Sequence, residues 1–289
     1  MKKTMKRFIT AMLTMAIMLV FVACTHTGEE AIIKEESMRI VSVAPSITEL
    51  IYALGKGDQL VGRSDYCDYP VEANEVPSVG SLSDPNIEKI LELQPDIVFA
   101  SAHFKEDIAK KLEGLGIKIE VIYNAEDFSG SYDAINRVGE MVNAKDEALE
   151  LVVSLEKEIE YIKEQVKEQE IPTVYYVVGF GKDGDYTATG DTFVAQMIEI
   201  AGGENIAKDA TGWKYSLEKI IEEDPEYILI SQNYGMKEEF EQTEGYKELS
   251  AVKHNKLIEI DDDLLNRQGP RLAQGVESLA KILHPDLFN

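Results

Sequence analysis

Two stretches of the chain, residues 86–101 (NIEKILELQPDIVFAS) and residues 216–231 (SLEKIIEEDPEYILIS), share one pattern at an offset of 130 positions. Glu, Lys, Ile, Glu, Pro and Ser recur in register, and most other positions keep their chemical type. In each copy, apolar residues spaced three to four apart give way, after a proline, to an uninterrupted apolar run. This order predicts a short amphipathic helix, a turn and a buried strand. We therefore expect two similar halves; the alternative is a coincidental match, because helix–proline–strand units are common in α/β proteins.

Strand and helix patterns alternate outside the two copies as well. The apolar run 40–44 precedes Pro45-Ser46, which favours a helix start, and Gly55, which favours a helix end. Further strands are predicted at 59–62, 118–123, 173–178 and 257–260, and helices at 105–115, 192–201 and 270–283, the last with Pro270 in its first turn. This alternation predicts an α/β fold of two Rossmann-like lobes with parallel sheets.

A single long helix is predicted between the two lobes. Residues 144–170 contain neither Gly nor Pro, and their apolar residues form one stripe at spacings of three to four. The 27 residues would span about 40 Å, and Asn143 with Asp146 resembles a capping arrangement. A coiled coil is the alternative, but we favour a rigid strut, 143–170, between an N-terminal lobe at 39–142 and a C-terminal lobe at 171–289.

The front end has the pattern of an export signal. Four cations within residues 2–7 precede the apolar run 8–23, which at 16 residues is short for a membrane span. The run ends at Val22-Ala23-Cys24, which resembles a bacterial lipobox except for Phe21, so residues 1–23 are predicted to be a signal peptide and Cys24 to carry lipid. The polar residues 24–38 are then a flexible tether to the cell membrane. Plain secretion is the alternative.

Composition and motifs argue against several other functions. A formal net charge of −24 disfavours nucleic acid and anionic headgroups as partners. The G-x-G-x-x-G at Gly179, Gly181 and Gly184 is not followed by a helix start, so we interpret it as a ligand-facing loop and not as a nucleotide site. The four histidines, His26, His103, His254 and His284, have no metal-ligand spacing, and Cys67 has no catalytic partner.

Aromatic and polar residues gather in loops that follow predicted strands. His103 lies just past the strand of the first copy, where ligands collect in parallel sheets. The other candidates are Tyr66, Cys67, Asp68, Tyr69 and Pro70, then Tyr186, Trp213 and Tyr215, and finally residues 263–267. A few polar groups among aromatic rings suit a bulky, partly apolar ligand; ordinary core or turn positions are the alternative.

Four motifs resemble a known family. They are APSITEL within residues 40–54, SDYCDYP at 64–70, AGGENI at 201–206 and NRQGPR at 266–271. The chain resembles the extracytoplasmic substrate-binding proteins of ABC importers for cobalamin and ferric siderophores over nearly all of its length after the signal segment. The resemblance implies two α/β lobes bridged by one long helix, with ligand held between them, no enzymatic activity and no cofactor. It also implies a monomer that delivers its small-molecule ligand to a permease dimer with ATPase subunits.

The resemblance assigns roles to particular residues. Glu88 and Glu218, one in each copy of the repeat, match the acids that meet arginines of the permease. The ligand-binding positions carried over are Tyr66, Tyr186, Trp213 and the segment Asp263, Leu264, Leu265, Asn266 and Arg267. Pro45, Cys67, Asp68, Tyr69 and His103 complete the predicted ligand-binding set. Leu264 and Leu265 stand where some cobalamin binders have aromatic residues.

Charge guides the choice among ligands. A ferric catecholate is strongly anionic and should require a cluster of cations, whereas Arg63, Lys182, Lys214 and Arg267 are scattered. We therefore expect cobalamin or a related corrinoid, with a ferric siderophore and then haem as alternatives. An enzyme of nitrogenase-like or chelatase-like architecture is the alternative from another class, and it would need clustered Cys or His ligands.

Overall fold

The first parallel sheet is built from apolar segments that alternate with helices. In this computed structural model, which describes residues 37–123, 127–182, 184–233 and 235–288, its strand order is β2-β1-β3-β4. The strands are β1 (Ile40–Ser42), β2 (Leu60–Arg63), β3 (Ile97–Ser101) and β4 (Lys118–Ile122). All three pairings are parallel, with Ile40 opposite both Leu60 and Ile97. Strand β1 is buried throughout and β3 over its first four residues, as expected for a central strand covered on both faces.

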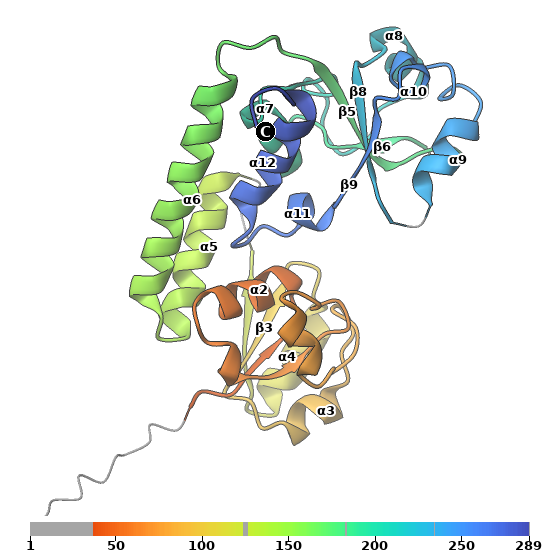
Figure 1. The fold of residues 1–289 in the computed structure, drawn as a ribbon. Helices are drawn as coiled ribbons and strands as arrows, with labels where there is room; N and C mark the ends of the chain where they lie inside the picture. The colour runs from red at the N-terminus through yellow and green to blue at the C-terminus, as the bar shows by residue number, and fades with distance from the viewer. Residues whose placement is uncertain (1–36, 124–126, 183, 234, 289) are drawn as a thin grey trace, which may run out of the picture. The chain divides into compact units, whose positions relative to one another are not determined.

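Helices and short 3₁₀ turns connect these strands (Figure 1). They are α2 (Pro45–Ala53), η1 (Gly57–Gln59), η2 (Val71–Glu75), α3 (Ile87–Glu92), α4 (Glu106–Gly114) and α5 (Phe128–Met141). The predicted lipidation site, Cys24, lies outside the described residues. None of the described helices is long and apolar enough to span a bilayer.

The second sheet is mixed and not wholly parallel. Its order is β6-β5-β8-β9, with β7 also paired to β5, and β6 runs antiparallel to β5. The strands are β5 (Thr173–Gly179), β6 (Tyr186–Thr187), β7 (Glu204–Asn205), β8 (Tyr227–Ser231) and β9 (Leu257–Ile260). The helices are α7 (Phe193–Ile200), α8 (Leu217–Glu223), α9 (Met236–Gln242), α10 (Ser250–Lys253), α11 (Asp263–Asn266) and α12 (Leu272–Leu283). The sheet is therefore parallel, as predicted, except at β6, which is only two residues long and follows the glycine-rich turn.

The repeated stretch forms the predicted helix, turn and strand in both halves. The side chains of Asn86 and Ser216 cap α3 and α8 by accepting hydrogen bonds from the backbone N–H groups of Lys89 and Lys219. Strands β3 and β8 then enter the interior of their sheets, each beside the first strand of its half. The two sheets thus have equivalent central units.

Helix α6 (Lys145–Val166) is the predicted strut, but it is shorter than expected. Its 22 residues span about 33 Å, and its buried stripe packs against α5 and α12, with α7 also in contact (Figure 1). The acidic residues after Val166 oppose the helix dipole, and Pro172 disfavours helix in the residue before it. The capping prediction was wrong, because Ala144 is the N-cap and Asn143 has a left-handed φ of 54°. The predicted start of helix α12 was also wrong, because the helix begins at Leu272, two residues after Pro270.

Candidate functional site

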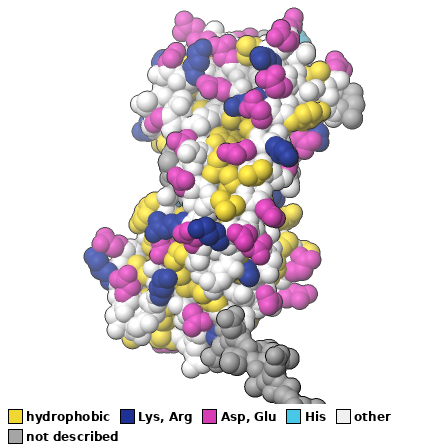
Figure 2. All heavy atoms as spheres, turned by 90° about the vertical axis from the view of Figure 1, so that its left-hand side faces the viewer, with side chains coloured by type: hydrophobic (Ala, Val, Ile, Leu, Met, Phe, Trp, Pro, Cys, Tyr) yellow, Lys and Arg dark blue, Asp and Glu magenta, His cyan; other side chains and the backbone are white. Residues whose placement is uncertain are grey.

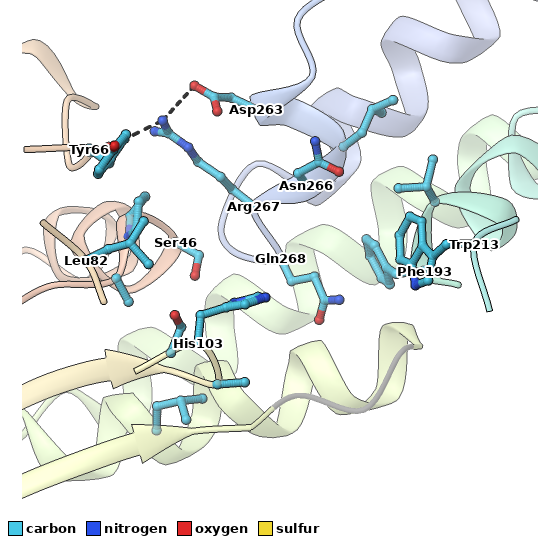
Figure 3. A pocket seen from close by; sticks show the side chains of 17 residues that line it. Ser46, Tyr66, Leu82, His103, Phe193, Trp213, Asp263, Asn266, Arg267 and Gln268 are labelled. Atoms are coloured by element: carbon cyan, nitrogen blue, oxygen red, sulfur yellow. Dashed lines mark hydrogen bonds and ion pairs between the residues drawn. The ribbon is translucent and has the colours of Figure 1, made fainter. Parts of the chain in front are cut away.

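The main cavity, so called because residues of both halves line it, has a volume of about 560 Å³ and lies at the carboxyl ends of the parallel strands (Figure 3). Residues 44–46 reach it directly after β1, and residues 101–103 reach it after β3. Strand order reverses between β1 and β3, and parallel sheets gather ligands at such a switch point. The second half contributes residues 263 and 265–268, with Phe193 and Val194 from α7 and Trp213 from the loop before α8.

Two exposed aromatic rings form the walls of this cavity. Tyr66 is 55% exposed and Trp213 is 40% exposed, although tyrosine and tryptophan normally bury most of the ring. Figure 3 places Tyr66, His103 and Trp213 around the same space. We call Tyr66 and Trp213 the aromatic walls. Open aromatic surface of this kind suits contact with a flat apolar ligand.

Charged residues from both halves meet beside the cavity in one cluster. Glu49 on α2 accepts two hydrogen bonds from Arg271, from Nε at 2.7 Å and from Nη2 at 2.6 Å. Arg267 donates from Nη1 to Glu49 at 3.0 Å and to Asp68 at 2.8 Å, and its Nη2 lies 2.7 Å from Asp263. We call Glu49, Asp68, Asp263, Arg267 and Arg271 the interlobe charge cluster.

The centre of the cluster is removed from water, whereas Asp68 and Asp263 at its edge remain partly exposed. Glu49 is 2% exposed and Arg271 9%. Burial lowers the pKa of Arg267, but hydrogen bonds to Asp68 and Glu49 outweigh that effect and raise it overall. Burial also raises the pKa of Asp263, against the opposing effect of Arg267. Both guanidinium groups are therefore cations whose charge is already matched by carboxylates.

The structure brings together most, but not all, of the predicted ligand residues. Those that line the cavity are Pro45, Tyr66, His103, Trp213, Asp263, Leu265, Asn266 and Arg267. Asp68 lies in the charge cluster, and the Tyr69 ring lies 4.1 Å from the Arg271 guanidinium carbon. These two therefore support the cluster, and neither lines the cavity.

The structure places three predicted ligand residues away from the main cavity. Cys67 is fully buried, with its sulfur 3.1 Å from the Ser64 hydroxyl and 3.6 Å from the Ser42 carbonyl oxygen. Leu264 does not line the cavity, because adjacent residues on the short helix α11 point in different directions and Leu265 is the one of the two that faces the cavity. Tyr186 faces a separate hollow in the second half.

This second hollow, of about 740 Å³, is lined by Gly181 and Gly184 of the glycine-rich turn and by Glu218. The Tyr246 hydroxyl donates to Asp185 and accepts a hydrogen bond from the Gly181 N–H at 3.1 Å. Burial, followed by the hydrogen bond to Asp185, raises the pKa of Tyr246 to about 12, and burial raises the pKa of Asp185. The glycine-rich loop therefore faces this hollow and not the main cavity.

Several lining residues were missed by the sequence analysis. They are Ala44, Ser46, Leu82, Ser101, Ala102, Ile122, Phe193, Val194 and Gln268. Ser101 and Ala102 could have been found, because they precede His103 at the end of a parallel strand. Leu82 and Phe193 carry no such local signal. The partnership of Glu49 with Arg271 joins residues 222 positions apart, which no local pattern reveals.

Comparison with known proteins places the chain in a family. The model of the family described as "Periplasmic binding protein" matches residues 40–264. The chain belongs to the periplasmic binding protein family. This is a family of binding proteins, in agreement with the prediction that the chain is not an enzyme.

Individual members of the family resemble the chain over most of its length. An uncharacterized ABC transporter substrate-binding lipoprotein, YvrC of Bacillus subtilis (strain 168), is 36% identical over 91% of this chain and 85% of its own. The predicted lipid anchor and export agree with that description.

Solved structures share the fold. The periplasmic heme-binding protein RhuT from Roseiflexus sp. RS-1, in apo form, superposes with a TM-score of 0.79 at 25% identity, covering 86% of this chain and 98% of that chain. The periplasmic vitamin B12 binding protein BtuF of Vibrio cholerae superposes with a TM-score of 0.70 at 27% identity, covering 85% and 96%. This periplasmic binding protein thus shares its two-lobed fold with binders of different tetrapyrroles.

Proposed function

We propose that the protein is the lipid-anchored, extracytoplasmic binding subunit of an ABC importer and that its main cavity takes cobalamin or a related corrinoid. The description of the Bacillus subtilis relative and the signal segment ending at Cys24 support the first part. The pairing of charges around the cavity supports the second part.

The observation that carries the ligand choice is that the positive charge of Arg267 is already matched by carboxylates. Among the described residues that line the cavity, Arg267 is the one Arg or Lys, and it already contacts Glu49, Asp68 and Asp263. A carboxylate-bearing haem or an anionic ferric siderophore would need an unmatched cation. A corrinoid presents mainly neutral amides, which suit the hydroxyl and amide groups of the lining residues Ser46, Ser101, Asn266 and Gln268.

The surface as a whole also disfavours an anionic ligand. The chain has a formal net charge of −24, and acidic side chains are spread over the face shown in Figure 2. A field of this sign slows the approach of anions. The long-range charge and the local pairing of Arg267 therefore favour the same class of ligand.

Haem is the second candidate, favoured by one residue. The exposed imidazole of His103 faces the cavity and is a suitable axial ligand for iron. The similarity to a heme-binding protein is compatible with this ligand. Against it stands the lack of an unmatched cation for the propionates, so we rank haem below a corrinoid; a ferric siderophore faces the same objection more strongly.

The experiment that tests the ligand is equilibrium dialysis of residues 24–289 against cyanocobalamin, haemin and a ferric catecholate siderophore. Bound ligand is measured by its own absorbance, and bovine serum albumin serves as a control for nonspecific uptake of haemin. We expect saturable binding of cyanocobalamin at one site per chain. Saturation by haemin or the siderophore without cyanocobalamin binding would refute the proposed ligand.

The two copies of the repeat suggest how the protein meets its permease. Glu88 and Glu218 are both exposed and both lie in the first turn of a capped helix, α3 and α8. Hydrogen bonds from its own backbone N–H and from the Ser216 hydroxyl lower the pKa of Glu218 and keep it anionic. Equivalent charges on both lobes suit a two-fold symmetric partner. We expect the double variant Glu88→Lys, Glu218→Lys to bind ligand normally and to lose uptake in cells.

We expect the two halves to move little relative to each other when ligand binds. Helix α6 packs against α5 and α12, and the interlobe charge cluster links α2 to residues 267 and 271. A continuous helix and buried ion pairs resist the hinge motion that loose connections permit. The radius of gyration from solution scattering should therefore stay nearly constant when ligand is added, and a large decrease would contradict this.

A further inference from the structure

Trp213 has a backbone conformation that a bulky side chain rarely adopts. Its φ is 69°, and it follows Gly212 at φ 78°. The left-handed region costs free energy for every residue except glycine, and residues held there gather at functional sites. The ring is 40% exposed, so extensive burial does not offset this cost. Other interactions must hold the residue in place.

Two neighbouring side chains supply those interactions. The Trp213 N–H donates to Thr189 Oγ1 at 3.2 Å, and this hydroxyl donates to Asp191 Oδ1 at 2.5 Å. The second carboxylate oxygen, Oδ2, lies 3.4 Å from the Gly212 N–H, which donates to it. On the other side, the Thr187 N–H donates to the Trp213 carbonyl at 2.9 Å. Both left-handed residues are thus bonded to the segment 187–191.

This segment is itself fixed to the wall of the cavity. Thr189 is fully buried, and its carbonyl accepts hydrogen bonds from the backbone N–H and the hydroxyl of Thr192, the N-cap of α7. The next residue, Phe193, lines the same cavity as Trp213. The chain of contacts therefore runs from a helix end to the exposed ring.

We propose that Thr189 and Asp191 are positioning residues, which fix the backbone of Trp213 and thereby hold its ring in a binding-ready orientation in the wall of the main cavity. The proposal rests on the proposed function of that cavity as the ligand site. A ring fixed before binding loses less conformational freedom when ligand arrives. The hydrogen bond from Thr189 also lowers the pKa of Asp191, which keeps this acceptor ionised at neutral pH.

The test uses Trp213 as its own probe, because the chain has one tryptophan. Time-resolved fluorescence anisotropy of unliganded residues 24–289 reports the local motion of that ring. We expect Thr189→Val to increase the fast local motion and to weaken cyanocobalamin binding about tenfold, a loss typical of one hydrogen bond to a charged network. Thr189→Ser keeps the hydroxyl and should restore both properties.

Two further variants separate positioning from general stability. Asp191→Ala removes the acceptor at an exposed site, so it should fold if Thr189→Val does not, and it should also loosen the ring. In a Trp213→Asn background, where the ring is absent and Asn tolerates left-handed φ, Thr189→Val should cause no further loss of affinity. Unchanged ring motion in both Thr189→Val and Asp191→Ala, or an affinity loss that persists without the ring, would overturn the proposal.

The ring-motion measurement needs no ligand, so it decides the positioning role even if cyanocobalamin fails to bind. In that case the proposed ligand fails while the role of Thr189 and Asp191 is judged by anisotropy alone.

Discussion

The interlobe charge cluster and the aromatic walls are both built from residues of the two halves, yet they differ in burial and in pairing. In the cluster, Glu49 and Arg271 are almost inaccessible and every charge has an opposite partner. In the walls, Tyr66 and Trp213 leave large parts of their rings open to solvent. The contrast teaches that the buried pair of Glu49 with Arg271 holds the halves together and the open rings contact the ligand, whereas Arg267 and Asp263 belong both to the cluster and to the cavity lining. Variants should therefore affect stability and ligand affinity separately.

The largest loss of stability is expected from removing Glu49, the carboxylate that contacts both arginines of the cluster. Glu49→Ala leaves Arg271 buried beside Arg267 without its bidentate partner. Removing one member of a buried ion pair costs about 3–5 kcal/mol, and we expect a loss of this size in the free energy of unfolding from urea titrations. The matched control, Glu106→Ala, breaks a fully exposed pair with Lys110 and should leave the free energy of unfolding nearly unchanged. Similar losses in both variants would contradict the distinction.

Truncating either ring of the aromatic walls should have the opposite outcome: ligand affinity falls and the free energy of unfolding stays nearly unchanged. Trp213→Ala and Tyr66→Ala should each weaken ligand binding by about 1–3 kcal/mol, the range for truncating an aromatic contact, with the free energy of unfolding within about 0.5 kcal/mol of wild type because both rings are exposed. Tyr161→Ala on α6 is the control, since that ring is also exposed but lies outside the main cavity. Calorimetric titration measures the affinity. A stability loss without an affinity loss would assign the rings to the core.

The smallest expected effect is at the rim of the cluster. Asp263→Asn keeps the shape of the side chain and removes one of the carboxylates around Arg267. Because Asp263 is only half-buried, we expect a change in the free energy of unfolding below about 1 kcal/mol at neutral pH.

The pH dependence of this effect has a definite sign. Burial raises the pKa of Asp263, so the folded protein takes up this proton more readily than the unfolded chain. The contribution of Asp263 to stability therefore increases as the pH falls through its folded pKa towards the unfolded value. The wild type should gain stability relative to Asp263→Asn over that interval, and a relative loss would contradict the assigned cause.

Local pattern was sufficient for the central elements of the fold. The repeat gave α3–β3 and α8–β8 because each copy contains its own cap, apolar spacing and proline. The stripe on α6 was found for the same reason, although its end was set by the turn before Pro172 and not by the pattern. Strand β6 was missed because its two residues depend on pairing with β5.

The site was predictable only where function follows position along a strand. His103 and Asp263 were found because they follow strand ends, and Tyr66 and Trp213 because they are aromatic residues in loops. Cys67 and Tyr186 share those sequence features but point elsewhere, which only tertiary packing decides. Four of the five residues of the interlobe charge cluster lay in three of the quoted motifs, but pairing Glu49 with Arg271 required the fold that brings α2 to the start of α12.

The central claim is that the matched charge of Arg267 selects a neutral tetrapyrrole, and the ratio of affinities for cyanocobalamin and haemin tests it most directly. The ratio is measured in the wild type and in the double variant Asp68→Asn, Asp263→Asn, which leaves Arg267 and Arg271 to share Glu49. We predict that the wild type prefers cyanocobalamin and that the variant shifts at least about tenfold towards haemin, as one unmatched charge would require. A wild type that prefers haemin, with a ratio that the variant leaves unchanged, would contradict the account.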